Sequence, residues 1–203
     1  HLLEVSDQFR RARQIAFEHT GRFVAGMDEA FQHRPAQPAM LHPGTQVARS
    51  FDEILADPAV KLVAAAAVPN ERGPIGCRVM QAGKDYFTDK TPFTELAQLD
   101  EAKRVAAATG RKYMVYYSER LHVECAAHAS DLVHGGAIGK VVQVIGLGPH
   151  RIGAKAGRPA WFWERAKFGG ILCDIGSHQI EQYLHYSGAT DATVVSAAIA
   201  NHA

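Results

Sequence analysis

The sequence predicts an α/β protein: a doubly wound parallel sheet followed by a second domain. Strand-like and helix-like segments alternate with short links through residues 22–117, as they do along such a sheet. The run Val60–Val68 is continuously apolar, which is typical of a strand buried on both faces of a parallel sheet. The alternation stops after Ser118, so we expect two domains, residues 1–119 and 120–203.

The composition excludes several classes of protein. Apolar residues make up 47% of the 203 residues and charged residues 21%, which is typical of soluble globular chains. The formal net charge of +1 gives no reason to expect nucleic acid or an anionic membrane as a partner. The longest strongly apolar run, Leu62–Val68, is far shorter than the roughly 20 residues that span a bilayer.

The cysteines indicate the compartment. Cys77, Cys125 and Cys173 are odd in number, widely spaced and without a CxxC pair. This pattern argues against a disulfide scaffold and indicates a reducing compartment, so we expect a cytoplasmic protein.

The elements of the first domain are joined by short links, except for a Pro-rich stretch over 29–48 that we expect to be mostly loop. We expect helix 2–19, strand 22–27, helix 51–57, strand 60–68, helix 74–82, strand 85–88, helix 94–109 and strand 111–117. Ser50–Glu53 is a capping box, and Thr94 caps the last helix of this domain. Pro74 suits the first turn of a helix, and Gly83 and Gly110 suit the position just after one.

The second domain has a different pattern. We expect helix 120–134, a polar–apolar strand over 140–147, an irregular stretch with two tryptophans, helix 171–187 and a strand-like run over 192–200.

Polar or turn-forming residues follow four predicted strands, at Asp28, Pro69-Asn70, Asp89-Lys90 and Ser118. Ligands of open α/β sheets bind at the carboxyl ends of parallel strands, so these residues are expected to line one edge. An acid at Asp28 accepts hydrogen bonds from the ribose hydroxyls of a dinucleotide and repels a 2′-phosphate, which favours NAD over NADP. A helix cap or turn is the alternative role for Asp28.

The glycine-rich loop that usually accompanies such an acid is not in this sequence. Gly146-Leu147-Gly148 lacks the third glycine and no helix is expected after it. We therefore expect the missing loop just before His1, and more of the second domain after Ala203.

Two motifs carry groups for acid–base chemistry. Lys90 lies in the turn Asp89–Pro92, where its ammonium can stabilise a developing alkoxide; an ordinary surface turn is the alternative. Asp174 and His178 are spaced to share one face of a helix. A histidine takes a hydroxyl proton near neutral pH, and the carboxylate orients it or holds substrate. A helix cap and a solvated histidine are the alternative.

A third cluster has the spacing of soft metal ligands. It comprises His122, Cys125 and His128, with Glu124 between them. Successive steps of three residues drift around a helix and no fourth ligand is evident, so we expect no metal.

Five segments together resemble the Gfo/Idh/MocA family of NAD(P)-dependent oxidoreductases. In order they are SFDEILADPAVKLVAAAAVPN, MQAGKDYFTDKTPF, YMVYYSERLH, GAIGKVVQV and GGILCDIGSHQIEQYLHYSG, and they span residues 49–188. The resemblance implies a Rossmann-like domain and then an α+β substrate domain with a mainly antiparallel open sheet. That sheet often mediates oligomers, so a homo-oligomer is expected at full length.

The resemblance also implies residue roles. The family's Glu-Lys-Pro motif falls on Asp89-Lys90-Thr91, and its Tyr-Asn-x-Arg motif falls on Tyr117–Arg120 with Ser118 in place of asparagine. The expected cofactor contacts are Asp28, Val68, Pro69, Asn70, Asp89, Lys90 and Ser118. The expected catalytic residues are Lys90, Asp174 and His178. The expected substrate side comprises Arg120, Trp161, Trp163, Arg165, Lys167 and His178, with core packing as the alternative for the tryptophans.

The implied reaction is hydride transfer between NAD or NADP and a hydroxyl-bearing carbon of a sugar or polyol. His178 would remove the hydroxyl proton, Lys90 would stabilise the alkoxide, and Asp174 would position substrate or tune His178. Two alternatives stay open: an NAD-dependent glycoside hydrolase of related architecture, and a non-catalytic member that binds a sugar or a protein partner.

Overall fold

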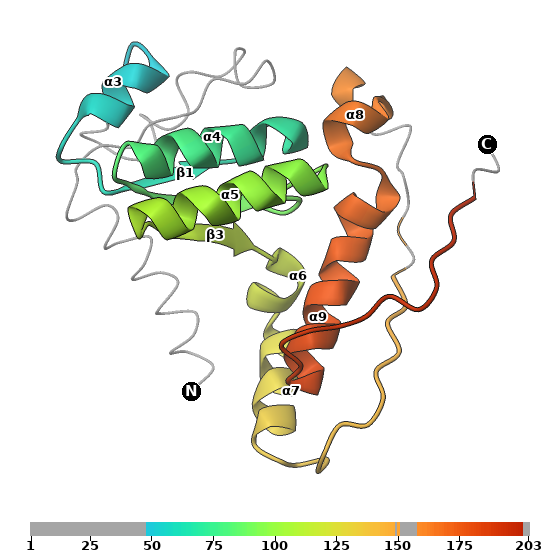
Figure 1. Ribbon diagram of the computed structural model, residues 1–203. Coiled ribbons are helices and arrows are strands. Elements are labelled where there is room, and N and C mark those ends of the chain that lie inside the picture. Colours follow the sequence, from blue (N-terminus) through green and yellow to red (C-terminus); the bar gives the residue numbers. More distant parts are fainter. Residues whose placement is uncertain (1–47, 149, 151–157, 201–203) are drawn as a thin grey trace.

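The computed structural model describes residues 48–148, 150 and 158–200 (Figure 1). The predicted helix 2–19, the strand 22–27 and Asp28 lie outside the described residues. Within the described part, no helix is long and apolar enough to cross a membrane.

A three-stranded parallel sheet lies at the centre of the first half. Its strands, in spatial order, are β1 (Leu62–Ala65), β2 (Asp85–Asp89) and β3 (Tyr113–Tyr116). Helices α4 (Pro69–Gln81) and α5 (Leu96–Thr109) make the two crossovers and lie side by side on one face of the sheet (Figure 1). The α/β class and the parallel sheet predicted from the sequence are therefore confirmed.

The core lies between this sheet and its helices. Val79, Met80 and Tyr86 are fully buried, and Val105 is nearly so. Val63 of β1 and Ile54 of the short helix α3 (Phe51–Ala56) complete the buried cluster around Tyr86. The apolar run at Val60–Val68 thus supplies core side chains, although only Leu62–Ala65 pair as a strand.

The Ser50 cap of α3 is confirmed, although the Glu53 carboxylate accepts from the Arg49 amide at 2.7 Å rather than from Ser50, and the cap of α5 is corrected. The Ser50 hydroxyl accepts a hydrogen bond from the Glu53 amide at 3.2 Å, as a capping box requires. The N-cap of α5 is Glu95 rather than Thr94, and its side chain makes no capping hydrogen bond. Gly83 and Gly110 have φ of 77° and 66°, the left-handed conformation expected after a helix.

The predicted start of α4 at Pro74 is wrong, because the helix begins at Pro69 and Pro74 lies inside it. Proline cannot donate to the carbonyl of the residue four positions earlier, here Asn70. The side-chain amide of Gln98 donates to that carbonyl at 2.9 Å instead. A residue of α5 thus supplies the hydrogen bond that Pro74 cannot make.

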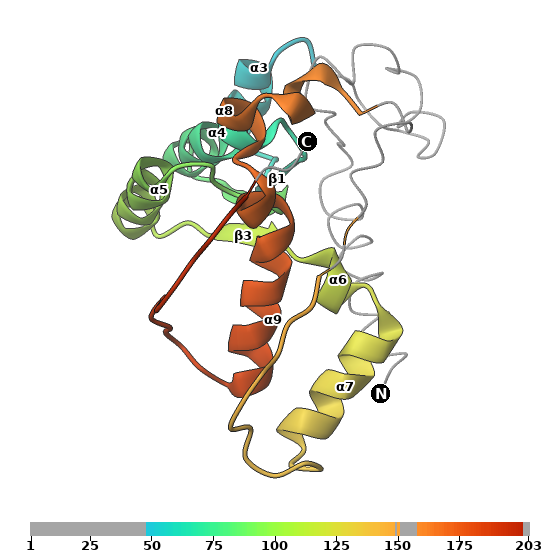
Figure 2. The same ribbon diagram turned by 90° about the vertical axis from the view of Figure 1, so that its right-hand side faces the viewer.

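The second half contains helices that stand against the carboxyl edge of the sheet. The elements are α6 (Ser118–Leu121), α7 (Glu124–His134), η2 (Ala160–Trp163), α8 (Arg165–Phe168), the π-helical turn η3 (Leu172–Gly176) and α9 (Ser177–Ser187). Helices α7 and α9 lie side by side below the sheet (Figure 2). The single helix predicted over 120–134 is split, because Val123 takes an extended backbone conformation.

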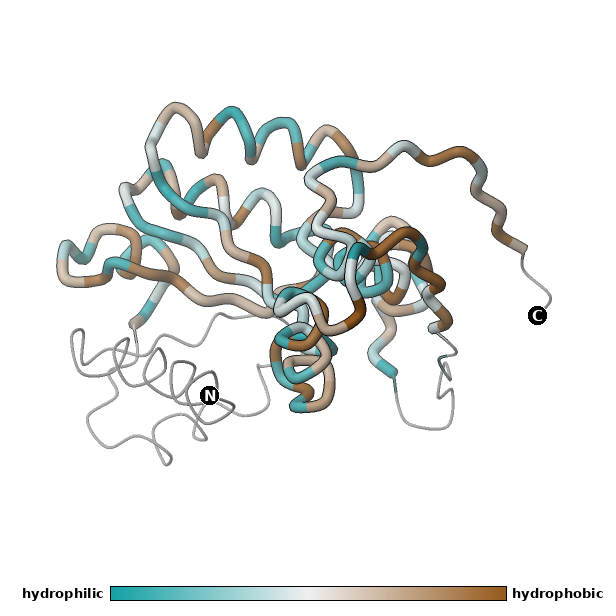
Figure 3. Tube along the Cα trace, turned by 90° about the horizontal axis from the view of Figure 1, so that it is seen from below, coloured by the Kyte–Doolittle hydropathy of each residue, from teal (hydrophilic) through white to brown (hydrophobic). Residues whose placement is uncertain are grey.

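The strands predicted over 140–147 and 192–200 are wrong, and the antiparallel sheet is not seen in the described residues. A strand needs a neighbouring strand for its backbone hydrogen bonds, and no described segment pairs with either run. Val142 and Val195 are 90% and 94% exposed. The last run leads away from the body with apolar residues along it (Figure 3).

Candidate active site

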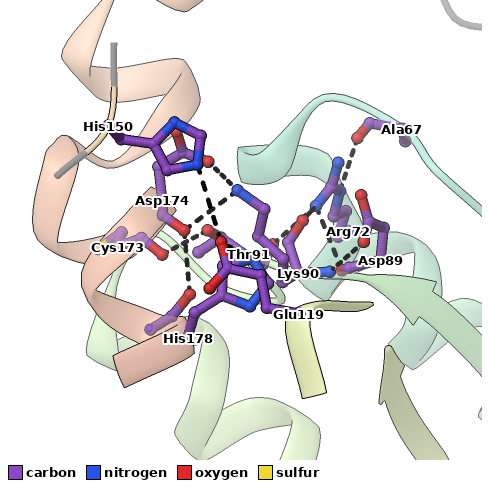
Figure 4. A network of polar contacts seen from close by, with 11 residues as sticks. Ala67, Arg72, Asp89, Lys90, Thr91, Glu119, His150, Cys173, Asp174 and His178 are labelled. Carbon is purple, nitrogen blue, oxygen red and sulfur yellow. Dashed lines mark hydrogen bonds and ion pairs between the residues drawn. The ribbon is translucent and has the colours of Figure 1, made fainter. Parts of the chain in front are cut away.

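Lys90, Asp174 and His178 lie together where the carboxyl edge of the sheet meets the start of α9 (Figure 4). Lys90 directly follows β2, whereas Asp174 lies in η3 and His178 in α9. The Lys90 ammonium donates to the Asp174 carboxylate and, at 3.1 Å, to the Asp174 main-chain carbonyl. The fold thus joins residues that are 84 positions apart in the chain.

The Lys90–Asp174 ion pair is partly shielded from water, with side-chain exposures of 18% and 19%. Shielding strengthens the attraction between the charges compared with a surface pair. An ammonium has three N–H donors. In the described structure Lys90 donates two hydrogen bonds, both to oxygens of Asp174. A donor is therefore left for a substrate oxygen.

His178 is enclosed by protein. Its side chain is 4% exposed, and its ring packs edge-on to Tyr117 with 5.8 Å between ring centroids. The Nδ1 atom is buried without a hydrogen-bond partner among the described residues, and Nε2 lies 3.9 Å from Oε1 of Glu119. Burial lowers the pKa of His178, and the Glu119 carboxylate partly opposes this effect. The imidazole is therefore neutral at pH 7 and able to accept a proton.

The lowered pKa of His178 predicts how the stability of the folded protein depends on pH. Burial lowers it below the ordinary value of 6.5, and His185 of α9 shifts in the same direction for the same first cause. As pH falls below about 6.5, the unfolded chain therefore binds more protons than the folded one. The two histidines therefore stabilise the folded protein fully above that pH. This stabilisation is lost as the pH falls towards the pKa values that the histidines have in the folded protein.

We expect the urea midpoint to drop between pH 7.5 and 5.5, and to drop less in H178N and H185N. Each variant removes one group that protonates more readily in the unfolded chain. An identical pH slope in wild type and both variants would contradict the assignment.

The buried side chain of Arg72 in α4 ties the ends of β1 and β2 together. Its Nε donates to the Ala67 carbonyl at 2.7 Å, and its guanidinium also donates to the carbonyls of Asp89, Lys90 and Thr91. Burial lowers the pKa of Arg72, and Asp89 partly opposes this. Arg72 was missed from the sequence, although a cation in the first turns of a helix opposes the helix dipole and is a usable signal.

Replacing Arg72 with methionine is expected to lower the free energy of unfolding by about 2–4 kcal/mol, because four buried or partly buried carbonyls lose a donor. The matched control is R78M on the same helix, whose partner Asp52 is 81% exposed and whose loss should cost less than about 1 kcal/mol. Urea unfolding measures both. Equal losses in the two variants would show that the Arg72 contacts are energetically unimportant.

The residues predicted for the cofactor lie along the same edge. After β1, the start of α4 comprises Val68, Pro69 and Asn70. Asp89 is the last residue of β2, and Lys90 follows it. Ser118 is the first residue of α6, which follows β3. The Asn70 Oδ1 atom is buried without a hydrogen-bond partner among the described residues. The Asp89 carboxylate accepts from the Lys90 amide at 2.9 Å.

Of the residues predicted for the substrate side, His178 lies beside Lys90, whereas the others contact different neighbours. Arg120 donates from Nε to Glu181 of α9 at 2.6 Å, and that ion pair is mostly buried. Trp161 and Trp163 lie in η2, with Trp163 55% exposed, and pack around the ring of Phe162. Arg165 and Lys167 lie in α8, above η3 and α9 in Figure 1. No hydrogen bond or ion pair in the described part joins these η2 and α8 residues to Lys90, Asp174 or His178.

Two further residues complete the site and were missed from the sequence. Glu119 follows Ser118 in α6, and its Oε1 lies 3.9 Å from His178 Nε2 and 3.7 Å from His150 Nε2. Its position just after β3 is a signal that could have marked it, whereas nothing in the sequence marks His150. His122, whose spacing resembles that of a metal ligand, bonds through Nδ1 to the Tyr116 hydroxyl at 3.0 Å.

Comparison with known proteins gives the family. Residues 14–117 match the oxidoreductase family with an NAD-binding Rossmann fold, and residues 126–203 match the Gfo/Idh/MocA C-terminal domain. The chain belongs to the Gfo/Idh/MocA family. The resemblance stated from the sequence motifs is confirmed.

Several relatives are similar over most of this chain. An uncharacterised oxidoreductase of Schizosaccharomyces pombe is 30% identical over 155 residues, which are 72% of this chain and 39% of that protein. A protein from Erwinia carotovora atroseptica, described as an oxidoreductase, has a crystal structure that matches this one with a TM-score of 0.74. Its sequence is 40% identical, and the match covers 91% of this chain and 54% of that one. Levoglucosan dehydrogenase in complex with NADH and levoglucosan has the same fold, with 21% identity, a TM-score of 0.68, and coverage of 82% and 44%. The chain spans less than half the length of the curated relatives it matches, 39% and 44% of two of them.

One departure from the Gfo/Idh/MocA pattern has a structural role. Thr91 stands where the family motif has proline, it is buried, and its hydroxyl donates to the Cys173 carbonyl beside Asp174. Proline has no donor at this position. The substitution thus adds a hydrogen bond that ties the Lys90 segment to η3.

Replacing Thr91 with valine is expected to lower the free energy of unfolding by about 1–2 kcal/mol, because the shape is kept while a carbonyl loses its donor. T91S keeps the hydroxyl and should lose less than T91V. Urea unfolding of the two variants measures the difference, and equal stability of both would contradict a role for the hydroxyl.

Proposed function

We propose that this protein is a nicotinamide-dependent oxidoreductase that acts on a hydroxyl-bearing carbon of a sugar or polyol. The observation that carries the proposal is the meeting of the Lys90–Asp174 ion pair with the buried imidazole of His178 at the carboxyl edge of a parallel sheet. Family membership and the shared fold of levoglucosan dehydrogenase, which binds NADH and levoglucosan, support it.

The residues at this edge fit a nicotinamide dinucleotide. The unpartnered Asn70 Oδ1 offers an acceptor to a hydroxyl or amide donor, and the start of α4 offers backbone N–H groups. Val68, Pro69, Asp89 and Ser118 would hold the cofactor along the same edge. When bound, the cofactor supplies the hydride acceptor or donor. The preference for NAD rests on Asp28.

Each residue of the site has a separate role in this proposal. His178 accepts the hydroxyl proton at Nε2, the ring nitrogen that faces Glu119 rather than the enclosed Nδ1. Lys90 donates to the same substrate oxygen as negative charge develops on it. Asp174 fixes the direction of the Lys90 ammonium through its carboxylate and its main-chain carbonyl.

The test uses full-length protein, NAD or NADP, and a panel of sugars and polyols, with the absorbance of the reduced cofactor as readout. The expected result is net cofactor reduction with at least one substrate, and loss of that activity in H178Q. Cleavage of a glycoside without net reduced cofactor would overturn the proposal in favour of a glycoside hydrolase. Binding of sugars with no turnover across the panel would overturn it in favour of a non-catalytic protein.

A further inference from the structure

Glu119 lies between two imidazoles, His178 on one side and His150 on the other (Figure 4). The Oε1 atom of Glu119 is 3.9 Å from Nε2 of His178 and 3.7 Å from Nε2 of His150. The side-chain exposures of His178, Glu119 and His150 are 4%, 36% and 48%. Three groups that exchange protons therefore form a line from the buried site to solvent.

Glu119 is held in this place by neighbouring contacts between α6 and α9. Arg120, the next residue, pairs with Glu181 of α9, and the Gln182 side-chain amide donates to Glu119 Oε2 at 3.4 Å. The same helix carries His178. The distance between the carboxylate and the imidazole is thus set by one packed pair of helices.

Asp174 does not orient the His178 ring through a hydrogen bond, although the spacing of the two residues in the sequence suggested this role. Its carboxylate receives the Lys90 ammonium, and its main-chain carbonyl accepts from Lys90 and, at 3.1 Å, from Ser177. No hydrogen bond joins Asp174 to His178 in the described structure. Among the described residues, Glu119 is the carboxylate with an oxygen within 4 Å of a His178 ring nitrogen.

We propose that Glu119 and His150 form the path by which a proton passes between His178 and solvent. The inference rests on the proposed function, in which each alcohol oxidation releases one proton. The substrate O–H bond breaks and its proton bonds to the lone pair of His178 Nε2, while the C–H hydride goes to the nicotinamide acceptor that the proposed function supplies. The proton then moves to Glu119 Oε1, from there to His150 Nε2, and finally to water, so each residue returns to its starting state.

Both gaps exceed the length of a hydrogen bond, so Glu119 contacts its two partners in turn. The charges that face His178 are Glu119, Asp89 and Asp174, which favour its protonated form, and Lys90, which opposes it. Glu119 exerts the largest of these charge effects, and only burial acts more strongly. It therefore stabilises the imidazolium as well as receiving its proton.

The first arm of the test follows His178 by nitrogen-15 NMR titration of the histidine rings, which requires no substrate. In E119Q the shape is kept and the negative charge is removed, so the pKa of His178 is expected to fall below that of wild type. E101Q is the control, because Glu101 is an exposed carboxylate paired with Arg104 on α5. An unchanged His178 titration in E119Q would overturn the inference.

The second arm measures the oxidation rate of the full-length enzyme as imidazole buffer is added. E119Q and H150Q are expected to reduce kcat about tenfold at low buffer, and added imidazole should restore much of the loss. Wild type and E101Q should not respond to the buffer. If added imidazole does not restore the rates of E119Q and H150Q, the two residues have only a structural role. That result would also overturn the inference.

The two arms separate this inference from the proposed function. If wild type shows no oxidoreductase activity with any substrate, the proposed function and the catalytic path fail together, whatever the NMR titration shows. If wild type is active while either arm is negative, the path alone is wrong.

Discussion

Replacing Lys90 with methionine is expected to lower kcat about 100- to 1,000-fold, with a smaller change in the KM for substrate. The ammonium is placed to donate to an oxygen that becomes negative only as the hydride leaves, so its loss raises the barrier more than it weakens binding. Methionine has a similar length and apolar character to the lysine stem. The measurement is steady-state kinetics of the full-length protein with the substrate found in the panel.

Two comparisons make the Lys90 result specific. K103M removes an exposed lysine of α5 and should leave kcat unchanged. Because Asp174 acts through Lys90, the double variant K90M/D174N should be little slower than K90M, a clear departure from additive effects. Multiplicative losses in the double variant would mean that Asp174 acts independently, for example on the substrate.

Replacing His178 with glutamine is expected to lower kcat for oxidation about 100- to 10,000-fold, the usual range for a lost general base. The wild-type oxidation rate should rise with pH through the lowered pKa of His178 and then level off, because only the neutral imidazole accepts a proton. H178Q should lack this rise. Rates measured between pH 5 and 8 test both statements.

The control for His178 is H128Q, which changes an exposed histidine of α7 and should keep the wild-type pH profile. An H178Q enzyme that retained both its rate and the rise with pH would assign the base to another group.

The family was predictable because five segments of the sequence resemble it, and that resemblance implied that Lys90, Asp174 and His178 belong to one site. The helix start at Pro69 was not, because the hydrogen bond that allows Pro74 inside a helix comes from Gln98 of the next helix. Contacts of this kind join segments that no local pattern relates.

The same reason explains the missed parts of the site. Arg72 is recognised only when its acceptors after β1 and β2 are seen together, and Glu119 only when α6 is packed on α9. The alternating run at 140–147 satisfies the strand pattern, yet a strand forms only where another strand supplies hydrogen bonds. The periodicity of a segment indicates which structure the segment could adopt, but not which other segment it packs against or pairs with.

The central claim is that one substrate oxygen is reached by both Lys90 and His178. A crystal structure of the full-length protein with NADH and its sugar or polyol substrate tests it most directly. The account predicts the reacting oxygen within about 3.2 Å of both Lys90 Nζ and His178 Nε2, with the nicotinamide beside it. A substrate oxygen in contact with neither group, or a nicotinamide bound away from the carboxyl edge of the sheet, would contradict it.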